Sequence, residues 1–308
     1  MTERRQLELR PLRGLRFDPS AVGDLGTVVS PPYDVLDAAI VQQLEQANRH
    51  NVVRLILSRY FEPPYRAVRK RLEKWRDHGY LRADETPALY LYAYQADGRT
   101  VRGLIGLVGL RADEERVILP HEDVMSAPVA DRTLLMRTTE TNLEPILLVH
   151  DGTPALTDLC DRVVDRQPLT SFVALDGSTH QLWAINAPEE LTTIAVEIAP
   201  HRALIADGHH RYAAYRALQE ELASGPESPW AFGLAMLVAD GDSGLAIGPI
   251  HRVVAGLTLR DVEDAAAERG DRYEPAEEPP GALVPGQSAT FWLSDGTTWA
   301  TLTTERSS

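Results

Sequence analysis

The sequence predicts a mixed α/β fold (α/β with α+β character), rich in antiparallel pairing and followed by a small C-terminal appendage. Two observations support this prediction: short β-prone runs flank Asp-Gly turns, and helical patterns alternate with those runs. The chain has 308 residues, of which 44% are hydrophobic and 25% are charged. This balance is typical of soluble globular proteins with one large or two ordinary domains.

Several pairs of β-prone runs have the pattern of a hairpin with an Asp-Gly turn. They are ALYLYAY with RTVRGLIGLVGL, SFVAL with THQLWAI, and ATFWL with TTWATL. A further pair, AFGLAMLVA with LAIGPI, would be joined by the longer turn DGDSG. The antiparallel hairpin is therefore the expected building unit of the sheet.

Helical periodicity alternates with these hairpins along the chain. It predicts helices at about residues 35–48, 64–79, 131–141, 156–166, 189–198, 209–223 and 259–270. The segment EPAEEPPGALVPG, residues 274–286, concentrates prolines and acids and is expected to be a loop or linker. We therefore predict a main domain over residues 1–255 and an appendage over residues 256–308.

The charge and the cysteine count restrict the possible partners. A net charge of -14 and a pI near 5.1 repel nucleic acid and anionic membranes. The single cysteine, Cys160, can form neither an internal disulfide nor a thiolate cluster for zinc. No apolar run is long enough to span a bilayer. We expect a cytoplasmic protein that binds neither nucleic acid nor membrane.

Three familiar motifs are absent or incomplete. The chain has no GxxxxGK[ST] phosphate loop, and the glycines of GLIGLVG do not have the spacing of a dinucleotide fingerprint. HEDVM begins like a zinc-protease helix, but Met125 stands where the second histidine is needed. A nucleotide site, if the chain has one, is of another type.

The stretch ALIADGHHRYAAYRAL, residues 203–218, predicts a strand, a tight turn and a helix. Asp207 is expected to cap the helix, Gly208 permits the tight backbone, and the helix begins at His209. The first turn then carries His209, His210 and Arg211, where charged cations would each cost about 0.3–1 kcal/mol. A bound anion reverses that sign, so the pattern favours a phosphate cradle. The alternative is that Asp207 only caps, the imidazoles are neutral, and Arg211 extends to water.

Adjacent histidines point to different sides of a helix, so a metal site made by His209 and His210 is not expected. One of the two is expected to contact phosphate or to orient Asp207.

Polar residues gather in three other segments. VVSPPYDVLD joins an apolar strand to a Pro-Pro corner, and Asp34 there is either a helix cap or a functional group. Residues 119–149 combine acids, a histidine and an arginine around a helix, as a pocket wall would, and Glu122 is the best carboxylate. NVVRLILS and GPIHRVV place Arg54 and His251 in β-prone runs, pointing into a cleft or lying on a wet sheet face.

Together these motifs resemble the bacterial family called domain of unknown function 1015. The motifs that carry the resemblance are VSPPYDV, NVVRLIL, ILPHE, ADR, TxxNLxPI, IADGHHRY and HRVV, and they extend from about Thr27 to Val254. Many members of that family have a lysine in the stretch written here SAPVADR, where this chain has Val129. A role that depends on that lysine is therefore in doubt here.

The DGHHR motif is also similar to the phosphate-binding motif of the ParB/sulfiredoxin-like superfamily. That group includes CTP-hydrolysing partition proteins, ATP-using sulfiredoxin and free L-serine kinases. This resemblance implies a ParB/sulfiredoxin-like phosphate-binding core and a nucleotide-dependent phosphotransferase that acts on a small hydroxyl metabolite. Free L-serine is the best guess for the acceptor, and Mg²⁺ with ATP or ADP is the implied cofactor.

This hypothesis gives each candidate residue a role. Gly208, His209, His210 and Arg211 bind the phosphates; Asp207 binds Mg²⁺ or orients a histidine; and the catalytic carboxylates are Asp34, Glu122 and Asp207. The substrate-binding candidates are His121, Arg132, Asn142, Arg54 and His251. The alternatives are a nucleotide-binding switch or partner-binding module with slow or no turnover, and a phosphatase that acts on a phospho-metabolite. The acceptor, the nucleotide and the oligomeric state stay open.

Overall fold

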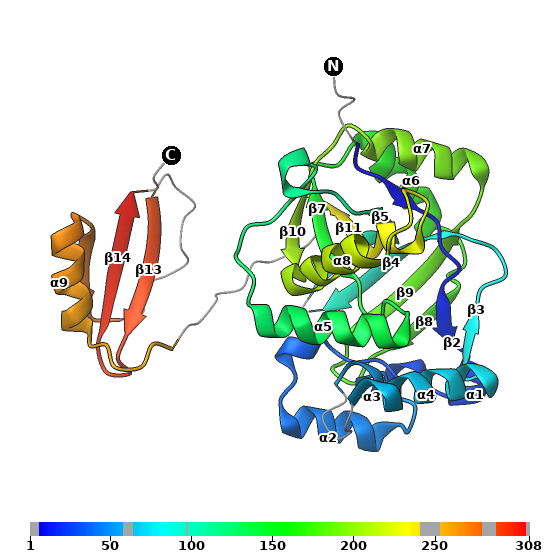
Figure 1. The fold of residues 1–308 in the computed structure, drawn as a ribbon, viewed down its shortest axis with the longest axis horizontal. Helices are drawn as coiled ribbons and strands as arrows, with labels where there is room; N and C mark the ends of the chain where they lie inside the picture. Colours follow the sequence, from blue (N-terminus) through cyan, green and yellow to red (C-terminus); the bar gives the residue numbers. More distant parts are fainter. Residues whose placement is uncertain (1–5, 58–63, 97, 241–252, 279–287, 306–308) are drawn as a thin grey trace. The chain divides into compact units, whose positions relative to one another are not determined.

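A computed structural model describes residues 6–57, 64–96, 98–240, 253–278 and 288–305. The chain divides into two compact units, Met1–Leu245 and Ala246–Ser308. The larger unit is built on a nine-stranded mixed sheet with helices around it (Figure 1). The predicted mixed α/β class is therefore confirmed, and the predicted domain boundary after residue 255 stays a prediction.

The large sheet has the strand order β6-β10-β7-β11-β5-β4-β9-β8, and β1 pairs with β5. Its parallel pairs are β6 with β10 and β7 with β11, and the other pairs are antiparallel. The β4–β5 and β8–β9 hairpins are confirmed. The strand bounds are β1 Leu9–Arg10, β4 Leu89–Ala96, β5 Arg99–Gly109, β6 Ile118–Leu119, β7 Ile146–His150, β8 Thr170–Val173, β9 Thr179–Ile185, β10 Ala203–Asp207 and β11 Phe232–Ala239.

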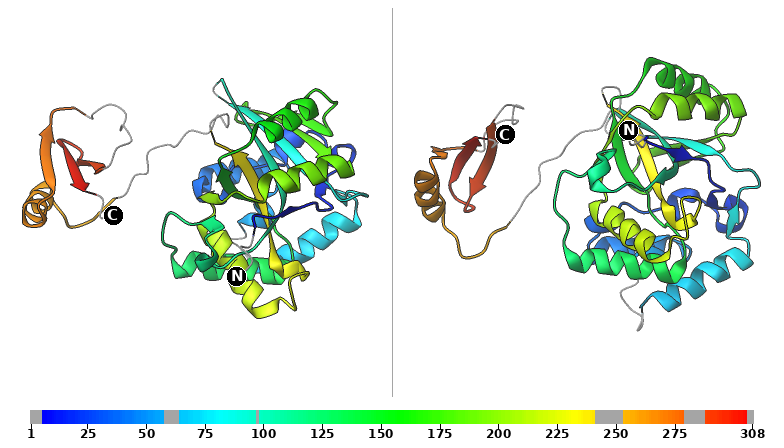
Figure 2. Two further views of the ribbon diagram at one scale, coloured as in Figure 1. Left: turned by 90° about the horizontal axis from the view of Figure 1, so that it is seen from above. Right: turned by 45° about the horizontal axis from the view of Figure 1, so that its top comes forward.

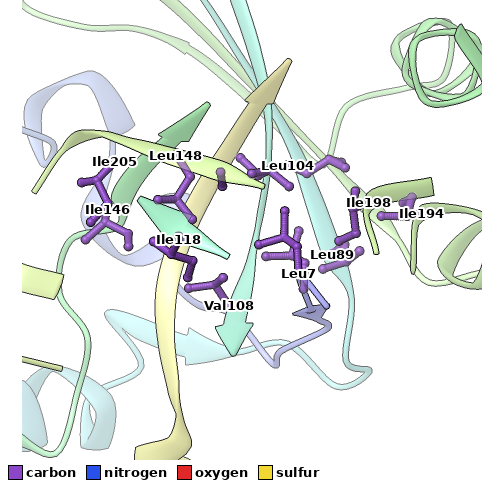
Figure 3. Close-up of a cluster of buried hydrophobic side chains, with 14 of the residues drawn as sticks. Leu7, Leu89, Leu104, Val108, Ile118, Ile146, Leu148, Ile194, Ile198 and Ile205 are labelled. Carbon is purple, nitrogen blue, oxygen red and sulfur yellow. The ribbon is translucent and has the colours of Figure 1, made fainter. Parts of the chain in front are cut away.

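One face of this sheet carries the main core. Strand residues alternate between the two faces, and the core face presents side chains such as Leu104, Leu148 and Ile205, which are almost fully buried. Ile194 and Ile198 of a helix pack against the same cluster (Figure 3). Burial of apolar area at about 25 cal/mol per Å² makes this cluster the main source of stability of the larger unit.

Helices surround the sheet, and two small clusters of apolar side chains hold the N-terminal helices together. Figures 1 and 2 show α5 beside α8, and α2, α3 and α4 grouped near one end of the larger unit. The bounds are α1 Pro19–Val22, α2 Ala38–Ala47, α3 Val53–Ile56, α4 Pro64–Asp77, α5 Ser126–Thr139, α6 Pro154–Val164, α7 Pro188–Ile198 and α8 His209–Leu222. Short elements complete the unit: β2 Leu15–Phe17, β3 Leu81–Ala83, and the 3-10 helices η1 Leu25–Thr27, η2 Tyr33–Val35, η3 Asp113–Glu115 and η4 Pro229–Ala231.

In its described residues, the smaller unit contains α9 (Leu259–Arg269) and a three-stranded sheet of order β12-β14-β13. Thr258 and Asp261 form a capping box at the start of α9, and Gly270 ends the helix with a φ of 78°. The hairpin of β13 (Ser288–Ser294) and β14 (Trp299–Glu305) is confirmed. Strand β12 (Arg272–Ala276) extends into the segment 274–286 that the sequence predicted to be a loop. Pro275 does not prevent this, because β12 is an edge strand, where proline is tolerated.

The predicted helices all form, and α5 begins earlier than predicted, at Ser126, because Pro128 fits the first turn of a helix. The prediction of a β-prone run at NVVRLILS is wrong, since Val53–Ile56 is a helical turn. Buried Asn51 explains this: its side-chain oxygen accepts from the Val53 N–H at 2.9 Å, as at a helix start.

The predicted strand before the Pro-Pro corner is also absent. The side-chain amide of Asn51 donates to the Thr27 and Val29 carbonyls at 2.9 and 2.8 Å, and these bonds hold that backbone in an irregular path. AFGLAMLVA forms β11, but its predicted partner LAIGPI, residues 245–250, lies outside the described residues. Across the described parts of the chain, none of the helices combines the length and apolar character that a membrane span needs.

A substitution at Gly26 tests how the N-terminal segment packs against β8, the edge strand of the large sheet. A Cβ at this position would lie 1.9 Å from the carbonyl oxygen of Val173 in β8. We expect Gly26→Ala to reduce the free energy of unfolding by about 1–3 kcal/mol, because backbone must move. In Gly109→Ala, the matched control, the atoms nearest to the added methyl are the ends of the flexible Glu8 and Arg111 side chains. Urea unfolding that gave equal midpoints for both variants would contradict this packing.

Candidate functional site

A β-bulge at the end of β10 positions Asp207. Ile205 pairs with Leu148, but Asp207 pairs with Leu147, so two residues of β10 advance while β7 advances by one. Ile205 lies in the core, whereas the bulge turns Asp207 onto the opposite face, with Leu147. The Asp207 carboxylate is half-exposed there.

Gly208 links the bulge to helix α8. Its backbone is left-handed, with φ 92° and ψ 31°, and it occupies the cap position of α8. The helix begins at His209 as predicted, but the prediction that Asp207 caps it is wrong, because Gly208 takes that place and no side chain caps the helix. A Cβ at Gly208 would lie 2.9 Å from Cγ2 of Ile146 and 3.1 Å from Nε of Arg211, so this position requires glycine.

Arg211 is buried, with only 3% of the residue exposed. One guanidinium nitrogen donates to the Asp207 carboxylate one helical turn back, and another donates to the carbonyl of Pro145. Its Nε is buried and has no hydrogen-bond partner among the described residues. The alternative in which Arg211 extends to water is thereby excluded. The guanidinium neutralises Asp207 and ties α8 to the start of β7.

Asp207 and Arg211 lie in a cleft of about 330 Å³ on this face of the sheet. Segments far apart in the sequence line it: residues 30–34 (the SPPYD loop), α3, β4, β5, the connection from α5 to β7, and the start of α8. The lining residues are Ser30, Pro31, Pro32, Val52, Ile56, Tyr92, Tyr94, Val101, Leu143, Glu144, Pro145, Ile146, Leu147, Asp207, Arg211 and Met236. Several of the sequence motifs therefore meet at one place.

Arg132 lies behind this cleft and is 3% exposed. Its guanidinium donates to the Ile56 carbonyl at 3.2 Å, stacks over Tyr33 at 4.5 Å, and lies 3.8 Å from the carboxylate of Glu144. Glu144 lines the cleft. Each of the two cleft carboxylates, Asp207 and Glu144, is thus close to a buried guanidinium, which lowers the local negative charge.

His209 and His210 hold the loop before α5 onto the start of α8. Nε2 of His209 accepts from the His121 N–H at 3.3 Å, and its Nδ1 lies 3.2 Å from the Glu122 carboxylate. Nε2 of His210 accepts from the Met125 N–H at 3.1 Å. Both accepting nitrogens must carry no proton, so the imidazoles are neutral. Burial lowers the pKa of His209, in agreement with this.

The remaining sequence-predicted residues are spread over several surroundings. Asn142 is half-buried directly before the lining segment at Leu143, and Glu122 lies on the loop beside His209. Arg54 pairs with Glu45 at 3.1 Å on α3, so the expectation that it lies on a strand is wrong. The backbone of Asp34 lies in η2 but its side chain is not described, and His251 lies outside the described residues.

Of the two proposed catalytic carboxylates whose side chains are described, Asp207 lines the cleft and Glu122 does not. Sequence reasoning missed Tyr92, Tyr94 and Glu144. The alternation of tyrosines in LYLYAY was a signal for the first two, since residues two apart share one face of a strand. Within the described residues, no group of three or more His, Cys, Asp or Glu side chains could hold a metal ion.

The histidine contacts make this loop sensitive to pH. Because burial holds the pKa of His209 below its ordinary value of 6.5, the unfolded chain takes up a proton at a higher pH than the folded chain. The stability from the His209 contacts is therefore present above pH 6.5 and is lost as the pH falls below it. We expect the hydrogen-exchange protection of the His121 amide, which donates to His209, to fall between pH 7.5 and 5.5.

The same experiment has a matched control. His209→Gln should flatten this pH dependence, whereas His78→Gln, at an exposed position directly after α4, should leave it unchanged. An identical pH profile in wild type and His209→Gln would contradict the assignment.

A family model described as "Protein of unknown function (DUF1015)" matches residues 9–308 of the chain. The match continues beyond Val254, where the motif resemblance ends, and so includes the smaller unit. No curated protein and no solved structure matches the chain.

Proposed function

The chain belongs to the DUF1015 family, whose description names no activity, and we propose from its cleft that it is a nucleotide-dependent phosphotransferase acting on a small hydroxyl metabolite. The proposed acceptor is free L-serine. One observation carries the proposal: the start of α8, with Asp207 and Arg211, lies in the same cleft as the SPPYD loop, β4 and the α5–β7 connection.

The start of α8 supports phosphate binding. The first N–H groups of a helix have no partner within the helix, and the positive end of its dipole attracts anions. The left-handed backbone of Gly208 connects Asp207, at the end of the strand, directly to this helix start. Arg211 offsets the charge of Asp207, so an approaching phosphate meets less repulsion.

Asp207 supports a role for Mg²⁺. Magnesium in nucleotide sites is held by one or two carboxylates together with substrate phosphates, and it needs no closed protein cage. The half-exposed Asp207 meets that requirement as a single carboxylate beside the helix start. Bound there with a nucleotide, the ion would neutralise charge on the phosphates. ParB/sulfiredoxin-like character of the core is part of this proposal.

Phosphoryl transfer depends mainly on alignment and charge stabilisation, and it needs one group to accept the proton of the attacking hydroxyl. Asp207 is paired with Arg211 and assigned to Mg²⁺, so the candidates for that group are Glu122 and Asp34. Nucleotide binding without product would favour a switch or partner-binding module, and phosphate release without nucleotide would favour a phosphatase.

Asp207→Asn tests the nucleotide site. Ligand at 100 times its Kd stabilises a folded protein by about 2.7 kcal/mol. We expect ATP or ADP with Mg²⁺ to raise the Tm of the wild-type protein, and Asp207→Asn to weaken nucleotide affinity at least about tenfold, since each tenfold is about 1.4 kcal/mol. CTP and GTP are measured in parallel.

Asp151→Asn is the matched control, because Asp151-Gly152 also connects a strand, β7, to a helix, α6, and Asp151 is exposed. This variant should keep the full thermal shift. A folded wild-type sample that gives no shift with any of these nucleotides would remove the premise of the proposal.

A further inference from the structure

A chain of hydrogen bonds runs from the β8–β9 turn to the cleft. Asp176 Oδ1 accepts from the Ser178 N–H at 2.9 Å and lies 2.5 Å from the Ser178 hydroxyl. That hydroxyl is 2.6 Å from Nε2 of His180, and Nδ1 of His180 is 2.7 Å from the hydroxyl of Tyr92. Tyr92 lines the cleft. An ordinary Asp-Gly turn is thus connected to a cleft residue.

Asp176, at the outer end of this chain of hydrogen bonds, determines which group donates and which accepts in each bond. The hydrogen bonds from Ser178 lower the pKa of Asp176, so its carboxylate is ionised and can only accept. The Ser178 hydroxyl gives its one proton to Asp176 and must accept from Nε2–H of His180. Burial lowers the pKa of His180, which keeps the ring neutral, so Nδ1 accepts the Tyr92 proton. The Tyr92 oxygen is left with acceptor capacity alone.

Packing fixes the rings of this chain in place. The His180 ring stacks on Phe172 with 4.9 Å between centroids, and Tyr92 and Tyr94 lie on its other neighbouring strand. Tyr92 is half-buried, and burial raises the pKa of its hydroxyl, which therefore stays protonated. Rigid aromatic groups with one oriented acceptor are suited to recognising a flat ring that carries a donor.

The two ends of the cleft are far apart. Between β10, which carries Asp207, and β4, which carries Tyr92, lie β7, β11 and β5. Four strand spacings of about 4.8 Å place the two strands about 19 Å apart. A free amino acid cannot reach both, whereas a nucleotide has phosphates at one end and an aromatic base at the other. Val101, Met236 and Pro31 line the cleft with apolar surface.

We propose that Tyr92 recognises the nucleobase, its oxygen accepting a hydrogen bond from the exocyclic amino group of an adenine-type base, with Asp176, Ser178 and His180 as positioning residues. This inference rests on the proposed function in one respect, that the ligand is a nucleotide. It adds the chemical class of the base and the residues that select it.

The test compares ATP with purine riboside triphosphate, which lacks the exocyclic amino group, by titration calorimetry of the full chain with Mg²⁺. Wild type should bind ATP about tenfold more tightly, because the analogue leaves the Tyr92 oxygen without its donor. Tyr92→Phe should bind both equally. Tyr94→Phe is the matched control: it changes a neighbouring tyrosine of the same cleft and should keep the preference.

A second readout needs no ligand. Nitrogen-15 NMR should find His180 as the Nε2–H tautomer in wild type. Asp176→Ala, at an exposed position outside the cleft, removes the acceptor of the Ser178 hydroxyl, which can then donate to Nε2 of His180; the variant should shift His180 toward the Nδ1–H tautomer and reduce the ATP preference.

The outcomes separate the two proposals. ATP binding with no preference over the analogue, or the same preference in Tyr92→Phe as in wild type, would overturn base recognition and leave the proposed function standing. An Nδ1–H tautomer in wild type would overturn the assigned direction of the chain. Absence of any nucleotide binding by folded wild type would overturn both proposals.

Discussion

The ion pair between Arg211 and Asp207 is the interaction on which the cleft depends. Burying a guanidinium is costly unless a carboxylate and further acceptors satisfy it, and removing one partner of such a pair costs about 3–5 kcal/mol. Here the bulge in β10 brings Asp207 to the cleft face, the left-handed Gly208 starts the helix without a Cβ, and Arg211 returns to Asp207 and the Pro145 carbonyl. Each of these features would be unfavourable alone, and together they fix one carboxylate beside the free N–H groups of a helix.

A buried guanidinium also compensates the second carboxylate of the cleft. Glu144 faces buried Arg132, which is in turn held by the Ile56 carbonyl and Tyr33. At the distant end, polarity is set by a chain of hydrogen bonds through the neutral side chains of Ser178 and His180, which begins at the ionised, exposed carboxylate of Asp176 and ends at Tyr92. One end of the cleft is therefore organised by compensated charges and the other by oriented dipoles. This asymmetry favours an elongated ligand with an anionic end and an aromatic end.

Local patterns predicted the elements well, because hairpins and amphipathic helices are encoded by neighbouring residues. The start of α8 at His209 follows from the Gly-His boundary in the same way. The bulge could not be predicted, since it exists only in the pairing of β10 with β7. The helical turn at Val53–Ile56 was missed because buried Asn51 overrides β propensity through contacts with a distant segment. Likewise, the two histidines of DGHHR accept hydrogen bonds from a loop that lies 85 to 88 residues earlier in the sequence. Their neutral state could therefore not be deduced from neighbouring residues.

A crystal structure with Mg²⁺ and a non-hydrolysable ATP analogue tests the central claim most directly. Our account predicts the terminal phosphates on the backbone N–H groups of His209, His210 and Arg211, with Asp207 on the metal side and the Asp207–Arg211 pair intact. The base should lie at Tyr92. Phosphates bound elsewhere on the chain, with the start of α8 covered by protein or by water alone, would contradict the account.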